Sequence, residues 1–142
     1  MFVAIKSDTT KAHLVRAILE SIAFRVFQMY EVMRKELSFP MTVLRCCGGV
    51  SQNDFLLETI ASLTGKLIDR MENPSYTANF GIAFLAGLSI GFWRSDAYVT
   101  DFIRVERTVE PGTEQECQYV REQYKQWCRA VALCCLKIIV EK

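Results

Sequence analysis

Residues 45–55, Arg-Cys-Cys-Gly-Gly-Val-Ser-Gln-Asn-Asp-Phe, constrain the fold of this chain more than any other stretch. The apolar run from Met41 to Arg45 predicts a buried strand, and Gly48 and Gly49 end it. The Ser-x-x-acid pattern of residues 51–54, followed by apolar residues, predicts the start of a helix. Glycine at such a turn permits a positive φ or the close approach of a flat ligand, because it has no Cβ.

Asn53 falls in the first turn of this predicted helix. Its side chain carries one acceptor and two donors, which are enough to recognise the edge of a base. A glycine pair between a strand and a helix is also typical of a plain structural turn. The pattern alone leaves both interpretations open.

The length and composition limit the classes of protein to which this chain can belong. The 142 residues suffice for one ordinary domain and not for two, and an apolar content of 51% favours a globular chain. The net charge of +1, without a basic tract, gives no electrostatic basis for a nucleic-acid partner. The six cysteines form no C-x-x-C pair and the one histidine, His13, is distant from them in the sequence. We therefore expect no metal site, and reduced thiols in a cytoplasmic protein.

Apolar residues at helical spacing predict a first helix from about Thr10 to Glu36, with Asp8 or Thr9 as its cap. Pro40 disfavours helix in the residue before it and so ends this segment.

The central part of the chain predicts a helix from Asn53 to Thr64, ended by Gly65, and then a short strand from Lys66 to Arg70. A third helix is expected from Thr77 to Ile90, closed by residues 93–96. Because it is apolar on nearly all sides, we expect it to be buried against neighbouring elements.

The last part predicts an extended segment from Arg104 to Glu110, a turn at Pro111-Gly112 and a long helix from Glu114 to Lys137. One face of this helix is apolar: Cys117, Val120, Tyr124, Trp127 and Val131. No apolar run reaches the ~20 residues that span a bilayer, so no membrane span is expected. Acylation of Cys134-Cys135 is a weaker alternative to a docked final turn.

The order helix, strand, helix, strand, helix, with a long C-terminal helix, predicts part of an α/β layered domain. We expect residues 1–142 to form a single partial domain, because two parallel strands are too few for a finished sheet.

Three segments occur in the order and spacing of one known family. They are residues 13–21 (His-Leu-Val-Arg-Ala-Ile-Leu-Glu-Ser), the Gly48-Gly49 pair with Asn53, and residues 81–93 (Gly-Ile-Ala-Phe-Leu-Ala-Gly-Leu-Ser-Ile-Gly-Phe-Trp). The chain resembles the C-terminal part of an FGGY-family carbohydrate kinase, closest to the glycerol kinases, over about residues 10–135. The resemblance implies an actin-like, ribonuclease-H-like ATPase fold in which two domains close over a cleft.

The resemblance also implies a reaction and a site. ATP, with Mg²⁺, donates its γ-phosphoryl group to a polyol or sugar hydroxyl. By matching position, Gly49 and Asn53 contact the adenine and ribose side of ATP, and Gly48 shapes the turn. Cys47 stands where the family commonly has Asp, and a thiol is a weak hydrogen-bonding group.

Catalytic residues are not apparent. The sequence contains neither an Asp-x-Gly-Thr phosphate loop nor a P-loop. Four carboxylates are each expected to be caps or solvated surface: Asp54, Glu58, Asp69 and Asp96. We therefore expect the chain alone to be inactive as a kinase.

Three functions remain open. The leading hypothesis is a fragment of a glycerol-kinase-like enzyme that carries the adenosine side of its cleft. The second is a non-catalytic nucleotide-binding module, and the third is a protein-interaction module with apolar docking faces. The strand from Met41 to Arg45 is expected to keep an open edge, so we expect a homo-oligomer, aggregation or a molten state.

Overall fold

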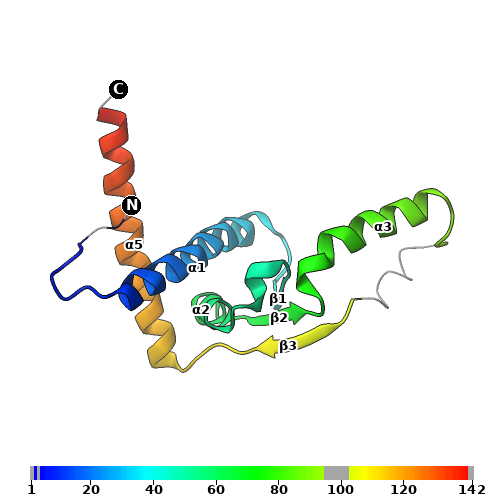
Figure 1. Cartoon of the computed structure of the whole chain (residues 1–142), viewed down its shortest axis with the longest axis horizontal. Coiled ribbons are helices and arrows are strands. Elements are labelled where there is room, and N and C mark those ends of the chain that lie inside the picture. The colour runs from blue at the N-terminus through cyan, green and yellow to red at the C-terminus, as the bar shows by residue number, and fades with distance from the viewer. Residues whose placement is uncertain (1, 3, 95–102, 141–142) are drawn as a thin grey trace.

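The computed structural model describes residues 2, 4–94 and 103–140, apart from the side chains of Pro74 and residues 134–140. Figure 1 shows the helices and strands along the chain. They are α1 (Lys11–Glu36), β1 (Val43–Cys46), α2 (Asp54–Thr64), β2 (Leu67–Met71), α3 (Thr77–Ser89), β3 (Val105–Val109) and α5 (Glu114–Val140). Two short 3₁₀ helices, η1 (Gly49–Gln52) and η2 (Pro74–Tyr76), follow β1 and β2. The predicted order of elements and the long C-terminal helix are confirmed.

The three strands form one sheet in the order β1-β2-β3. β1 and β2 are parallel, whereas β3 runs antiparallel to β2. The segment expected to be extended thus adds a third strand to the two parallel ones. In the part of the chain that the structure describes, no strand pairs with the outer side of β1.

Helix α1 begins where the sequence predicted, but its cap is Thr10 rather than Asp8 or Thr9. The hydroxyl of Thr10 accepts from the His13 amide at 3.4 Å, and His13 Nδ1 accepts from the Thr10 amide at 3.2 Å. Thr9 is not available as a cap because its hydroxyl accepts from the Lys6 amide at 3.0 Å.

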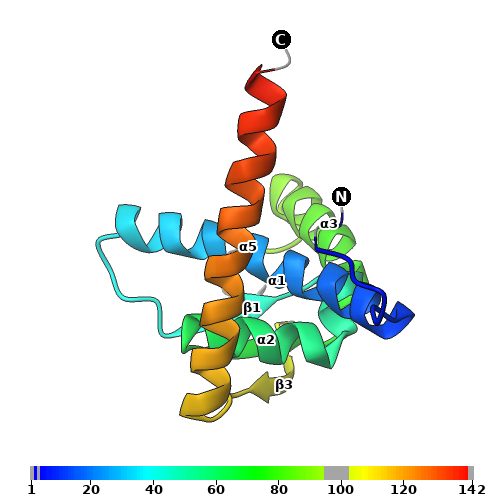
Figure 2. The ribbon, with the colours of Figure 1, turned by 90° about the vertical axis from the view of Figure 1, so that its left-hand side faces the viewer.

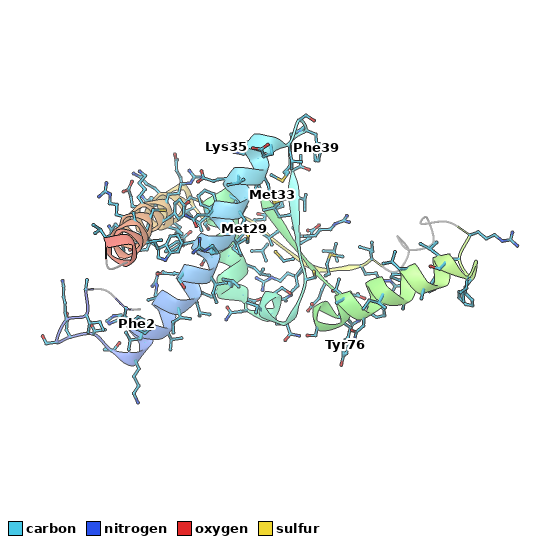
Figure 3. The ribbon with its side chains drawn as sticks, turned by 90° about the horizontal axis from the view of Figure 1, so that it is seen from above. Phe2, Met29, Met33, Lys35, Phe39 and Tyr76 are labelled. Atoms are coloured by element: carbon cyan, nitrogen blue, oxygen red, sulfur yellow. The ribbon has the colours of Figure 1, made fainter. Side chains whose placement is uncertain are left out.

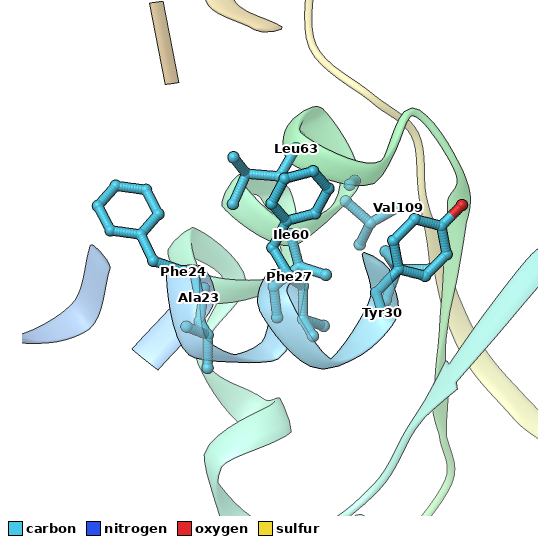
Figure 4. Close-up of a cluster of buried hydrophobic side chains, with 11 residues drawn as sticks. Ala23, Phe24, Phe27, Tyr30, Ile60, Leu63 and Val109 are labelled. Atoms are coloured by element: carbon cyan, nitrogen blue, oxygen red, sulfur yellow. The ribbon is translucent and has the colours of Figure 1, made fainter. Parts of the chain in front are cut away.

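A core of buried side chains joins α1, α2 and the sheet, as Figure 4 shows. Leu57, Leu63 and Ile68 are its largest fully buried side chains, each worth roughly 1.5–3 kcal/mol of transfer free energy. Helix α5 crosses α1 and α2 (Figure 2) and packs Tyr124 and Trp127 against this core. The predicted apolar face of the last helix is therefore confirmed at Val120, Tyr124 and Trp127.

Exposed apolar side chains lie outside this core. Met29 and Met33 are exposed on α1, and Tyr76 is exposed at the end of η2 (Figure 3).

Helix α3 extends away from the other helices (Figure 1). The prediction that this helix is buried against neighbouring elements is wrong for the described part of the chain. Ile82 and Leu85 are 69% and 68% exposed, and the only buried residue of α3 is Gly87. An apolar composition indicates that burial of the helix would be favourable, but it does not identify the element that would cover it. Among the residues described here, nothing covers that face.

No helix in the described part of the chain is long and apolar enough to cross a membrane. Cys46, Cys47, Cys117 and Cys128 are free thiols. Asp96 and the side chains of Cys134 and Cys135 lie outside the described residues.

Candidate functional site

The turn after β1 needs glycine at its first position. Gly48 has φ +93°, a region that L side chains rarely adopt, although a Cβ there would meet no atom within 4 Å. The dihedral angle, not crowding, therefore explains this glycine. The buried Ser51 secures the turn, because its hydroxyl donates to the Gly48 carbonyl at 2.7 Å and its amide donates to the same oxygen at 3.1 Å.

Gly49 is a different case, because its φ is not positive. A Cβ at Gly49 would lie 3.9 Å from Ser75 Oγ, which is ordinary contact. The packing of the chain therefore tolerates a side chain here. Gly49 in η1 and Ser75 in η2 lie together where β1 and β2 end, which is the edge at which open α/β sheets bind ligands.

Asn53, where the helix was predicted to begin, is the N-cap of α2 and not a residue of its first turn. Ser51, the first residue of the Ser-x-x-acid pattern, lies in η1. Asn53 Oδ1 accepts from the Leu56 amide at 3.2 Å. The Nδ2 group donates to no group in residues 4–94 or 103–133, so both of its hydrogens are available to a ligand. The cap fixes the side chain and leaves its donors free.

Asp54, the first residue of α2, lies between two arginines. One carboxylate oxygen accepts from Arg70 at 2.6 Å and the other from Arg107 at 2.7 Å. The hydrogen bond from Arg70 is the main reason that the pKa of Asp54 is below its usual value. Glu106 lies 3.3 Å from Arg70 Nε, in ion-pair range but without hydrogen-bond geometry, and Glu58 lies 3.7 Å from Arg107.

The carboxylates expected to be surface groups are partnered where they are described. Asp54 and Glu58 belong to this charge cluster, and Asp69 accepts from the Thr108 hydroxyl at 2.6 Å across β2 and β3. No group of three or more metal-ligating side chains exists in the described part of the chain.

A cavity of about 730 Å³ lies beside the glycine turn. Its lining includes Cys47, Asn73 and Phe80, but not Gly48, Gly49 or Asn53. Cys47 therefore stands between the turn and the cavity. A larger cleft of about 880 Å³ is at the other end of the sheet, near Gly65, and is remote from this turn.

Sequence reasoning brought together Gly48, Gly49 and Asn53 because they are nearly contiguous. It missed Ser75 and the contacts of Asp54 with Arg70 and Arg107. Those contacts span 16 and 53 residues, and no local pattern reports such pairs.

Comparisons with known proteins identify the class. A family model described as "FGGY family of carbohydrate kinases, C-terminal domain" matches residues 1–90. The fold is similar to xylulose kinase from Lactobacillus acidophilus (TM-score 0.73, 19% identity, 92% of this chain and 26% of that chain). It is also similar to Plasmodium falciparum glycerol kinase with ADP (TM-score 0.70, 25% identity, 91% of this chain and 25% of that chain). The fold is thus that of the actin-like sugar kinases.

The sequence narrows this class. The chain is 38% identical over 130 residues to glycerol kinase 5 of Homo sapiens, which is 92% of this chain and 24% of the relative. The chain therefore belongs to the FGGY family of carbohydrate kinases, and within it is glycerol-kinase-like. It spans about a quarter of the length of the relatives it matches.

Proposed function

We propose that these residues, as part of one domain, form the adenosine side of the ATP site of a glycerol-kinase-like carbohydrate kinase. The reaction is transfer of the ATP γ-phosphoryl group to a polyol or sugar hydroxyl. One observation carries this proposal: Gly49 offers bare backbone at the carboxyl edge of the parallel strands, and the Asn53 cap presents two free donors near it in the sequence.

The chemistry of the edge fits a nucleoside. A glycine without a steric need inside the chain leaves space for the flat face of a base. Asn53 Nδ2 can donate to a ring nitrogen or a ribose oxygen. The Plasmodium falciparum relative has a structure with ADP, which supports a nucleotide here. Cys47 contributes only weak hydrogen bonding beside the turn.

The residues at this edge do not fit a Mg²⁺ ion. Mg²⁺ takes oxygen ligands, and the carboxylate nearest in sequence to Asn53, that of Asp54, is already bound by two guanidinium groups. We therefore propose that Mg²⁺ and the phosphates are held by residues outside these 142, and we assign no step through them. Four free thiols are consistent with a cytoplasmic location.

Calorimetric titration with ADP tests the adenosine site. We expect Asn53→Ala to weaken binding by about 1–2 kcal/mol, or about 5- to 30-fold, because hydrogen bonds of a partly buried site are lost. Gly49→Val should weaken it more, because the branched side chain occupies the space of the base. Gln52→Ala, an exposed residue of the same turn, is the matched control and should not change affinity. Unchanged affinity in both site variants would contradict the assignment.

A second candidate is protein docking without catalysis, either alone or together with nucleotide binding. The exposed face of α3 favours it, as does the edge of β1, which pairs with no other strand within the described residues, because apolar surface and open edges promote association. Sedimentation of the purified chain should then show a homo-oligomer or aggregate. A monodisperse monomer with a cooperative melt would contradict this candidate.

A further inference from the structure

Arg70 and Arg107 occupy directly opposed positions on β2 and β3. Like charges at opposed positions destabilise a sheet. In this chain the carboxylate of Asp54 lies between them and gives one oxygen to each guanidinium, at 2.6 and 2.7 Å. The two arginines are therefore compatible as neighbours because a residue of α2 neutralises them.

An exposed ion pair contributes little to stability by itself, and the side chains of Asp54 and Arg107 are 49% and 43% exposed. The side chain of Arg70 is only 12% exposed, and both oxygens of Asp54 are used. Since the two arginines are on different strands, the carboxylate joins the first turn of α2 to both β2 and β3. An acidic residue that only interacted with the dipole of α2 would not need to bind two arginines.

Asn53 directly precedes Asp54 in the chain. Gly49 begins η1, whereas Asn53 ends η1 and caps α2. Gly49 follows β1 through the Gly48 turn, which Ser51 secures. Asn53 is joined to η1 by its amide, which donates to the Val50 carbonyl at 3.1 Å, and to α2 by its cap bond to Leu56. Its position relative to the sheet therefore depends both on η1 and on how the N-terminus of α2 is held.

We propose that Asp54 is a positioning residue for nucleotide binding. By binding Arg70 and Arg107, it holds the N-terminus of α2 so that the amide group of Asn53 and the backbone of Gly49 face the same ligand. This role depends on the proposed adenosine site, but the charge cluster itself can be tested without nucleotide.

The nucleotide test is a double-mutant cycle in the full chain. Asp54→Asn keeps the size of the side chain and removes its charge. We expect ADP affinity to fall about three- to tenfold in the parent chain and to change little in an Asn53→Ala background, since coupled neighbours are not additive. Glu122→Gln, which removes the charge of an exposed ion pair on α5, is the control and should have no effect. Equal losses in both backgrounds would overturn the proposal.

The second test measures amide hydrogen exchange at Leu56, whose N–H binds Asn53 Oδ1. Asp54→Asn should accelerate exchange at this amide, while Glu122→Gln should not. Unchanged exchange at Leu56 would overturn the positioning role even if ADP binds. Faster exchange in a chain that binds no ADP would support the link between α2 and the sheet and contradict the adenosine site, so the two ideas fail separately.

Discussion

The indole ring of Trp93 lies directly against the Cα of Gly87, in the space that a Cβ at this position would occupy. The ring also packs edge-on against Phe84 and Phe92, with centroid distances of 5.2 and 5.0 Å. The Phe92 amide donates to the Gly87 carbonyl at 2.8 Å and so turns the chain back over α3. Gly87 is therefore a packing position at the end of an otherwise exposed helix.

Gly87→Ala should displace the Trp93 ring. Overpacking costs about 1–3 kcal/mol, which exceeds the gain of about 1 kcal/mol from the better helix propensity of alanine. In a Trp127→Phe background, we expect the Trp93 emission to shift to the red as the ring becomes exposed. Gly81→Ala is the control, because a Cβ there meets no atom within 4 Å and the substitution should be neutral or stabilising. Unchanged emission in Gly87→Ala would contradict the contact.

Substitutions at Gly48 and Gly49 should distinguish a glycine that the fold requires from one that it does not. Gly48→Ala forces a side chain into φ +93° and should destabilise the chain by about 1–3 kcal/mol. Gly49→Ala meets only ordinary contact with Ser75 Oγ and should change stability by about 0.5 kcal/mol or less. Urea unfolding measures both. Equal destabilisation would show that Gly49 is also a structural requirement.

Stability should fall in acid because two carboxyl groups are held ionised in the native state. Hydrogen bonds from Arg70 lower the pKa of Asp54, and those from Thr113 lower the pKa of Glu116. A lowered native pKa gives stability that is present above the ordinary carboxyl pKa and is lost as the pH falls through the native value. Unfolding midpoints from pH 7 to pH 3 should therefore decrease. Glu116→Gln should reduce this dependence, and a midpoint that rises toward pH 3 would exclude the linkage.

Core and α3 positions should respond differently to truncation. Leu57 is 1% exposed, so Leu57→Ala should cost about 2–5 kcal/mol through lost burial and a cavity. Leu85 is 68% exposed, so Leu85→Ala should change the free energy of unfolding by about 0.5 kcal/mol or less. Thermal or urea denaturation compares them. A large loss for Leu85→Ala would mean that α3 is covered in solution, for example in an oligomer.

The purified chain should not phosphorylate glycerol or sugars. It lacks phosphate-loop motifs in its sequence, and positioning and charge stabilisation both require such groups. A coupled assay of ADP release, with boiled protein as the control, measures this. Turnover above that control in contaminant-free protein would disprove the expectation.

Local signals predicted much of this fold. Strand β1, the glycine turn and α2 were found because Gly48, Gly49 and the apolar runs around them are contiguous in the sequence. The start of α2 was predicted to within one residue, but its cap was not. Ser51 and Asp54 imitate a capping pair, whereas the Ser51 hydroxyl bonds back to Gly48 and Asn53 is the cap.

Long-range features were not predictable in the same way. The apolar composition of α3 predicts that the helix is buried, but it cannot show whether another element of the chain lies against it. The exposure of α3 was therefore not predicted. The link from Asp54 to Arg107 joins residues 53 positions apart and depends on the arrival of β3 beside β2. Neither feature leaves a periodic signal in the chain.

The contact between Asp54 and Arg107 also selects the alignment of β3 on β2. Strand side chains alternate between faces, so a slip by one residue would move Arg107 and the buried Val109 to the opposite face together. Glu106 or Thr108 would then take the place opposite Asp54, and a glutamate there would repel it. The register of β3 on β2 is thus specified by charge as well as by burial, although the two strands are far apart in the sequence.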